Sequence, residues 1–183
     1  MFTVEAFVAE CLAAAEEGRG AIRAVLKRTI ADPEAIIRTL GEPRLSAAKP
    51  LYRSDKLTIL HITWPASYTQ VPHNHLVWAE IGVYSGREDN IFWRRVAPEG
   101  TREIEVIGAA SLTAGSCCSL EADAIHSVNN PLDRTTGSLH VYGGALAEGP
   151  PRSMWDGETL REMPLDPARD IRNEEIYNAR LLT

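Results

Sequence analysis

The chain has 183 residues, with 25 acidic and 19 basic side chains and a formal net charge of −6. That length predicts one domain with a sizeable core, and the lack of a basic block argues against nucleic-acid binding. No segment approaches the roughly 20 apolar residues of a membrane span, and the N-terminus has no basic leader. Three cysteines, two of them adjacent at Cys117-Cys118, predict free thiols in a reduced, cytoplasmic setting.

The first 45 residues have helical character. Residues 4–27 carry apolar side chains at three- and four-residue intervals, which indicates an amphipathic helix with Gly18-Arg19-Gly20 as the point where it can break. A second helix is predicted after Asp32, which offers an N-cap ahead of Pro33, and Gly41 is predicted to end it. We therefore expect two helices before the rest of the chain.

The remaining chain reads mainly as β-structure. β-Branched and aromatic residues predict a hairpin around Ser54-Asp55-Lys56. The predicted strands lie at 51–53, 57–64, 76–84, 90–97, 102–107, 111–113, 117–120, 125–128 and 137–143. Short strands separated by turn clusters are typical of an antiparallel sandwich or barrel. We expect a single domain, with a helical segment at 1–45, a barrel at 50–147, and a tail at 148–183 that is coil apart from a helix from Asp170 to Leu181.

Histidines carry the first functional signal. His73 and His75 are separated by one residue and followed by an apolar stretch. Alternate residues of an extended chain face the same side, so both imidazoles can bind one metal ion. Chance spacing on a solvated strand is the alternative. A third imidazole from His126 would leave one side of the ion open to small molecules, and three neutral ligands favour a transition metal over calcium or magnesium. His61 fits no motif, so we expect it to be packed or exposed.

These motifs resemble those of the cupins, whose signature is HxH, a later Glu and Gly, and a distant His followed by Asn. The matching residues are His73, His75, Glu80, Gly86, His126 and Asn130. Glu121 and Asp123 stand where the family usually has Pro and Gly. The resemblance implies a mainly β cupin double-stranded β-helix, or jelly-roll barrel, here with N-terminal α-helices.

Within the cupins the chain is most similar to the thiol dioxygenases that act on cysteine or 3-mercaptopropionate. Their Ser-x-His-x-Tyr strand is matched by Ser138, His140 and Tyr142, and Val77–Gly82 is similar to a run that follows HxH in bacterial members. The resemblance implies Fe(II) on the three metal-binding histidines and O2-dependent oxidation of a small thiol carboxylate to its sulfinate. It also implies a hydrogen-bonded relay along the Ser-x-His-x-Tyr strand. Without the family, His140 would be interpreted as a core histidine and Tyr142 as a half-buried strand residue.

The substrate carboxylate calls for a cation, and two arginines are candidates. Arg53 follows Tyr52 as in cysteine dioxygenases, and Arg152 lies near the position used in mercaptopropionate dioxygenases. Either could instead face solvent. Ala79 or Glu80 stands where mammalian-type enzymes have a cross-linking cysteine, so we expect no such cross-link. Glu80 is also a candidate fourth ligand: an unbroken strand would turn it away from the metal, and a bulge would reverse that.

Other functions stay open at this stage. A metal-dependent isomerase or hydrolase of the cupin type, or a cupin that binds a small ligand without chemistry, would carry the same histidines. The identity of the thiol and the formation of a homodimer are also open.

Overall fold

Eleven strands form two sheets in the computed structural model, which describes residues 1–96, 103–146 and 151–165. The strands are β1 (Ala47–Arg53), β2 (Thr58–Trp64), β3 (Tyr68–Asn74), β4 (Ala79–Ser85), β5 (Arg87–Arg95), β6 (Ile104–Thr113), β7 (Cys117–Leu120), β8 (Ile125–Asn130), β9 (Thr136–Tyr142), β10 (Ser153–Trp155) and β11 (Glu162–Pro164). Five strands form one sheet in the order β1-β2-β9-β4-β7, and six form the other in the order β11-β10-β3-β8-β5-β6.

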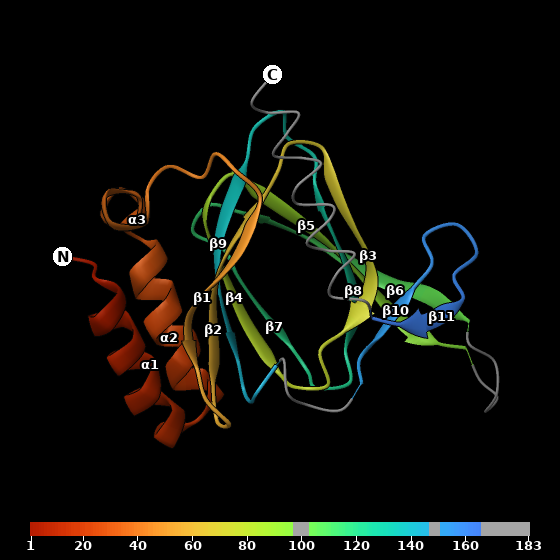
Figure 1. The fold of residues 1–183 in the computed structure, drawn as a ribbon, viewed down its shortest axis with the longest axis horizontal. Coiled ribbons are helices and arrows are strands. Elements are labelled where there is room, and N and C mark those ends of the chain that lie inside the picture. Colours follow the sequence, from red (N-terminus) through yellow and green to blue (C-terminus); the bar gives the residue numbers. More distant parts are fainter. Residues whose placement is uncertain (97–102, 147–150, 166–183) are drawn as a thin grey trace.

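The order of β2 to β9 decides the fold. These eight strands form two blocks, β2-β9-β4-β7 and β3-β8-β5-β6, with antiparallel pairing throughout. Each strand of the first half of this segment pairs with one of the second half, so a long double strand winds around one axis as in a jelly roll. The two sheets face each other across the interior (Figure 1). The predicted cupin double-stranded β-helix is confirmed.

Three helices precede the sheets, where two were expected. The helices are α1 (Val4–Glu17), α2 (Arg19–Ile30) and α3 (Pro33–Leu40). The first predicted helix is divided at Gly18, whose positive φ of 105° is a conformation that glycine adopts without strain. The Asp32 side chain accepts from the Ala35 amide at 3.0 Å and so caps α3, as predicted.

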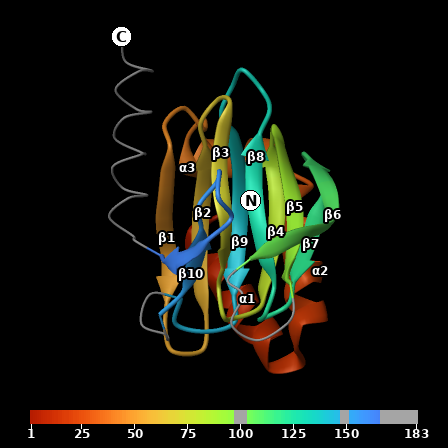
Figure 2. The same cartoon turned by 90° about the vertical axis from the view of Figure 1, so that its right-hand side faces the viewer.

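The helices cover the outer face of the five-stranded sheet (Figure 1), and in the view turned by 90° the six-stranded sheet lies in front of them (Figure 2). Their apolar side chains pack on Ile59, Leu139 and Val141, which point outward from β2 and β9. A second apolar cluster fills the space between the sheets. Because β9 is covered on both faces, all seven of its residues are buried.

His61 and the cysteines belong to this structural framework. His61 is buried on the helix side of β2, and its Nε2 lies 2.8 Å from the Tyr84 hydroxyl. Burial, with smaller contributions from the charges of Lys49 and His140, lowers the pKa of His61 to about 4. It is a packed histidine, one of the two predicted alternatives. The three cysteines are free thiols, as predicted. No helix among the described residues is long and apolar enough to span a membrane.

Several strands differ from the prediction. β3 covers residues 68–74, where His73 was expected in an extended segment but no strand bounds were predicted; its Pro72 lies at the register shift between Gln70 and His73, where a missing N–H costs no ladder bond. The segments predicted at 102–107 and 111–113 are one strand, β6. β10 and β11 occupy part of the tail expected as coil, because β10 pairs with β3 beside His73. The helix predicted from Asp170 to Leu181 lies outside the described residues.

Candidate metal centre

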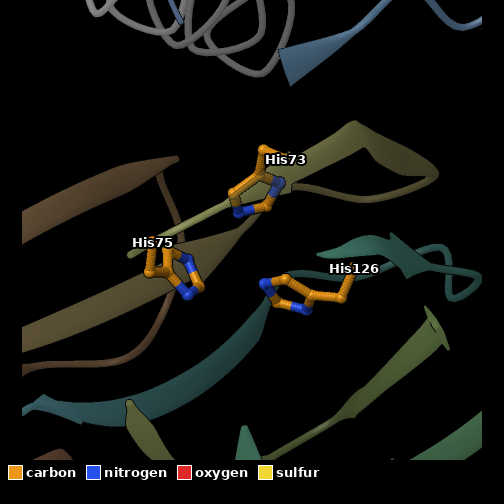
Figure 3. A group of neighbouring side chains, drawn as sticks. All are labelled: His73, His75 and His126. Atoms are coloured by element: carbon orange, nitrogen blue, oxygen red, sulfur yellow. The ribbon is translucent and has the colours of Figure 1, made fainter. Parts of the chain in front are cut away.

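Three buried histidines meet at one end of the strand pair β3 and β8. His73 of β3 lies directly opposite His126 of β8, and His75 follows just after the end of β3. One ring nitrogen from each lies within 4.8 Å of the other two, and the three rings converge on one point (Figure 3). Leu76, with a φ of 58°, turns the chain immediately after His75. The structure thus brings together the three predicted metal ligands.

The hydrogen bonds of two of these rings turn bare nitrogens toward the centre. His73 Nδ1 lies 3.0 Å from the Val71 carbonyl, which can only accept, so this nitrogen donates and Nε2 keeps its lone pair. His126 Nδ1 contacts Asn90 Oδ1 at 2.7 Å, and His126 Nε2 is buried with no hydrogen-bond partner among the described residues. A buried polar atom without a partner is costly. A metal ion at this point would satisfy it.

The charge state of the rings also suits a metal. Burial, followed by the repulsion of neighbouring histidines, places the pKa of His75 and of His126 well below the ordinary value. Neutral imidazoles are the form that binds metals. Three imidazoles fit zinc, copper, iron or nickel, and they leave coordination positions for small ligands.

A row of polar side chains runs along β9 toward the cluster. Ser138, His140 and Tyr142 are alternate residues that face the interior and are all buried. Ser138 Oγ lies 2.9 Å from His140 Nε2, and His140 Nδ1 lies 3.0 Å from the Tyr142 hydroxyl. The Tyr142 ring reaches the His75 ring at 4.9 Å between centroids. The geometry expected of a relay is present.

A cavity of about 180 Å³ opens beside the cluster. His73, His75 and Tyr142 line it together with Arg152, Gln70 and Tyr68. The Tyr68 hydroxyl donates to the Gln70 side-chain carbonyl. Arg152 precedes β10, and its positive charge contributes to lowering the pKa of His75. The cavity therefore combines two rings of the histidine cluster with a cation.

Comparison with known proteins gives fold similarity alone. No protein-family model matches the sequence, and no curated protein shows a significant match. The DMSP lyase DddQ from Ruegeria pomeroyi has 18% identity over 61% of this chain and 52% of its own, with a TM-score of 0.47. A Bacillus halodurans protein has 14% identity over 57% and 74%, with a TM-score of 0.47. An RmlC-like cupin from Methanocaldococcus jannaschii has 11% identity over 56% and 84%, with a TM-score of 0.46.

Two candidate residues lie away from the cluster. Arg53 is exposed at the end of β1 and does not line the cavity. Glu80 points to the helix side of β4, where it accepts from Ser119 Oγ at 2.7 Å and pairs with Arg19 at 3.3 Å. The chain turns at Leu76 and β4 begins only at Ala79, so no single strand joins His75 to Glu80. Within β4, Ala79 and Ile81 face the interior, and alternation turns Glu80 to the helix side. The carboxylate is not part of the metal-binding group.

A second carboxylate, Glu88, was not among the predicted site residues; it lies inside the barrel with no exposed surface. It accepts from Trp64 Nε1 at 2.8 Å and from Asn90 Nδ2 at 3.1 Å, and it lies 3.7 Å from His140 Nε2. Burial raises the pKa of Glu88, but the His140 contact and the two donors outweigh burial and hold it below the ordinary value. The signal in the sequence is the spacing of Glu88 and Asn90, which are alternate residues of β5 and so share a face. It was hidden because the polar run 87–90 resembles a turn in the sequence.

Proposed function

We propose that this protein is a mononuclear iron thiol dioxygenase that oxidises a small thiol carboxylate, cysteine or 3-mercaptopropionate, to its sulfinate. The overall reaction is R–SH + O2 → R–SO2⁻ + H⁺. Both oxygen atoms enter the product, sulfur loses four electrons, and O2 gains the same four. The proposal is supported chiefly by one observation: Tyr142, the last member of the Ser138-His140-Tyr142 row, and Arg152 line the same cavity as His73 and His75.

Fe(II) would be held by His73, His75 and His126, where the buried, unpartnered Nε2 of His126 fits a metal ligand. When bound, the iron would supply a centre on which thiolate and O2 come together, so that their encounter is intramolecular. The protein ligands carry no charge, so the site favours an anionic thiolate over a neutral thiol.

The cavity supports a small anionic substrate. Its volume of about 180 Å³ is below the roughly 300–1,000 Å³ of pockets for drug-sized ligands, so only a few heavy atoms fit. The Arg152 guanidinium can receive a carboxylate in two parallel hydrogen bonds. The Gln70 side chain lies in the same wall and offers a further polar contact. A molecule with a thiol at one end and a carboxylate at the other matches this arrangement of groups.

Tyr142 is proposed to hold a proton beside the reacting atoms. Burial, then the Glu88 charge, raises the pKa of the phenol, and Arg152 only partly opposes them. The phenol is therefore protonated at neutral pH. His140 fixes the position of its hydroxyl from one side, and Ser138 fixes His140 from the other. The row would orient one O–H group at the reacting end of the substrate.

The test is oxygen uptake by iron-loaded protein supplied with either thiol, with the product identified by mass. We expect one O2 consumed for each thiol lost, and both oxygen atoms of ¹⁸O2 in the sulfinate. Tyr142→Phe keeps the ring and removes the hydroxyl, so it should lower kcat by about a hundredfold, as expected for a group acting in proton transfer, with iron content unchanged. Iron-loaded protein that consumes no oxygen with either thiol would refute the proposal and favour a cupin of another class.

A further inference from the structure

Glu88 connects two parts of the site through hydrogen bonds of fixed direction. Its carboxylate accepts from Trp64 Nε1 on one oxygen and from Asn90 Nδ2 on the other. Asn90 Oδ1 in turn contacts His126 Nδ1 at 2.7 Å. In this series of hydrogen-bonded residues, Glu88, Asn90 and His126 are fully buried and Trp64 is partly buried, so water cannot replace a lost partner of the buried three.

The direction of each bond follows from the chemistry of the groups. An indole nitrogen can only donate, and an ionised carboxylate can only accept. Asn90 must therefore turn its NH2 group toward Glu88, which leaves its carbonyl oxygen facing His126. A carbonyl can only accept, so His126 carries its proton on Nδ1, and Nε2 is a bare lone pair directed at the cluster.

We propose that Glu88 is a positioning residue that fixes, through Asn90, the tautomer in which His126 presents its Nε2 lone pair to the metal. The inference rests on the three-histidine metal site of the proposed function and is independent of the reaction. Without a fixed partner the imidazole could carry its proton on Nε2, and that tautomer cannot bind a metal at this nitrogen.

Glu88→Gln is expected to reverse the chain of hydrogen bonds without changing its shape. The Gln oxygen must face Trp64, because the indole N–H needs an acceptor, so the Gln NH2 group faces Asn90. Asn90 then turns its carbonyl toward Gln, and its NH2 group faces His126 Nδ1. His126 is left with its proton on Nε2, where the metal would bind.

The test measures binding of Co²⁺, used as the probe metal, by competition with a chelator and by its visible ligand-field bands. We expect Glu88→Gln to weaken Co²⁺ binding about 10- to 100-fold, as is usual for partners that orient a metal ligand. Glu80→Gln is the matched control, because Glu80 is equally buried in the neighbouring sheet but points away from the cluster. It should bind Co²⁺ as the wild type does.

Rescue separates a positioning role from a general loss of structure. Asn90→Asp alone sets two carboxylates against each other and should also weaken binding. In the double variant Glu88→Gln/Asn90→Asp, the Gln NH2 group donates to Asp, and the second Asp oxygen accepts from His126 Nδ1. The double variant should therefore bind Co²⁺ more tightly than either single variant. If Glu88→Gln alone does not fold, a folded double variant that binds Co²⁺ more tightly than Asn90→Asp is the expected result.

Three results would overturn the inference. The first is a folded Glu88→Gln protein with wild-type Co²⁺ affinity, and the second is a folded double variant that binds Co²⁺ no better than the single variants. The third is a ¹⁵N NMR spectrum of the wild-type protein that places the His126 proton on Nε2 instead of Nδ1. Wild-type protein that binds no Co²⁺ would remove the metal site itself, whereas metal binding without oxygen uptake would refute only the proposed reaction.

Discussion

Arg152→Ala gives a quantitative prediction for substrate binding. Arg152 lines the cavity with His73, His75 and Tyr142. Hydrogen bonds to a charged group contribute about 1.5–3 kcal/mol, and each 1.36 kcal/mol corresponds to tenfold in rate. Because the arginine is only half-buried, water can partly replace it, which favours the lower part of this range. We expect kcat/KM for a thiol carboxylate to fall by about 10- to 100-fold.

The assay compares two substrates and two variants. Oxygen uptake is measured with 3-mercaptopropionate and with cysteamine, which has a thiol but no carboxylate. Arg152→Ala should lose activity toward the first and little toward the second, so that the preference for the carboxylate disappears. Arg53→Ala is the control, since Arg53 is exposed and lies outside the cavity wall.

Two results would refute this assignment. An equal loss for both substrates in Arg152→Ala would indicate damage to the fold or to the reacting centre. A selective loss in Arg53→Ala, with Arg152→Ala near wild type, would place the carboxylate elsewhere.

Three further predictions follow from particular residues. Alanine at any of the three cluster histidines should abolish stoichiometric metal binding, measured by metal analysis, and His61→Ala should retain it, because His61 lies on the opposite face of its sheet. His61 is neutral in the folded state, so its contribution to the free energy of unfolding should be complete above pH 6.5 and should fall by up to about 3 kcal/mol as the pH drops toward 4. Urea unfolding of the wild type and of His61→Gln over this pH range should show a smaller loss of stability in the variant. Gly143→Ala should cost more than about 2 kcal/mol, because its Cβ would lie 1.9 Å from the Trp78 ring, while Gly20→Ala meets no atom and should be neutral or stabilising in a thermal melt.

The sequence predicts those parts of the site that follow from alternation along one strand. His73 and His75 share a face, and so do Ser138, His140 and Tyr142, because each set is spaced by two residues. The short strands and turn clusters that recur along the chain predicted an antiparallel sandwich or barrel for a similar reason, and the cupin fold came from the resemblance of the histidine motifs. In both cases the information is local.

The remaining parts depend on contacts between distant segments. Glu88 could be recognised only once β5 was known to pair with β8, because this pairing brings Asn90 to His126. The direction of Glu80 depended on whether its strand was regular, and the choice between Arg53 and Arg152 depended on where β1 and β10 lie relative to the cavity. Spacing in the sequence contains none of this information.

The double burial of β9 has a consequence for how this protein can vary. Leu139 and Val141 pack on the helices, whereas Ser138, His140 and Tyr142 face the interior of the barrel, so a change in this strand disturbs two environments at once. Arg152 instead adjoins β10, a three-residue strand near the edge of the other sheet. Arg152 belongs to none of the apolar clusters, so its replacement alters one wall of the cavity without disturbing the core. Under the proposed function, selectivity for the carboxylate end of the substrate could therefore drift during evolution, or be redesigned, while the groups beside the thiol stay fixed.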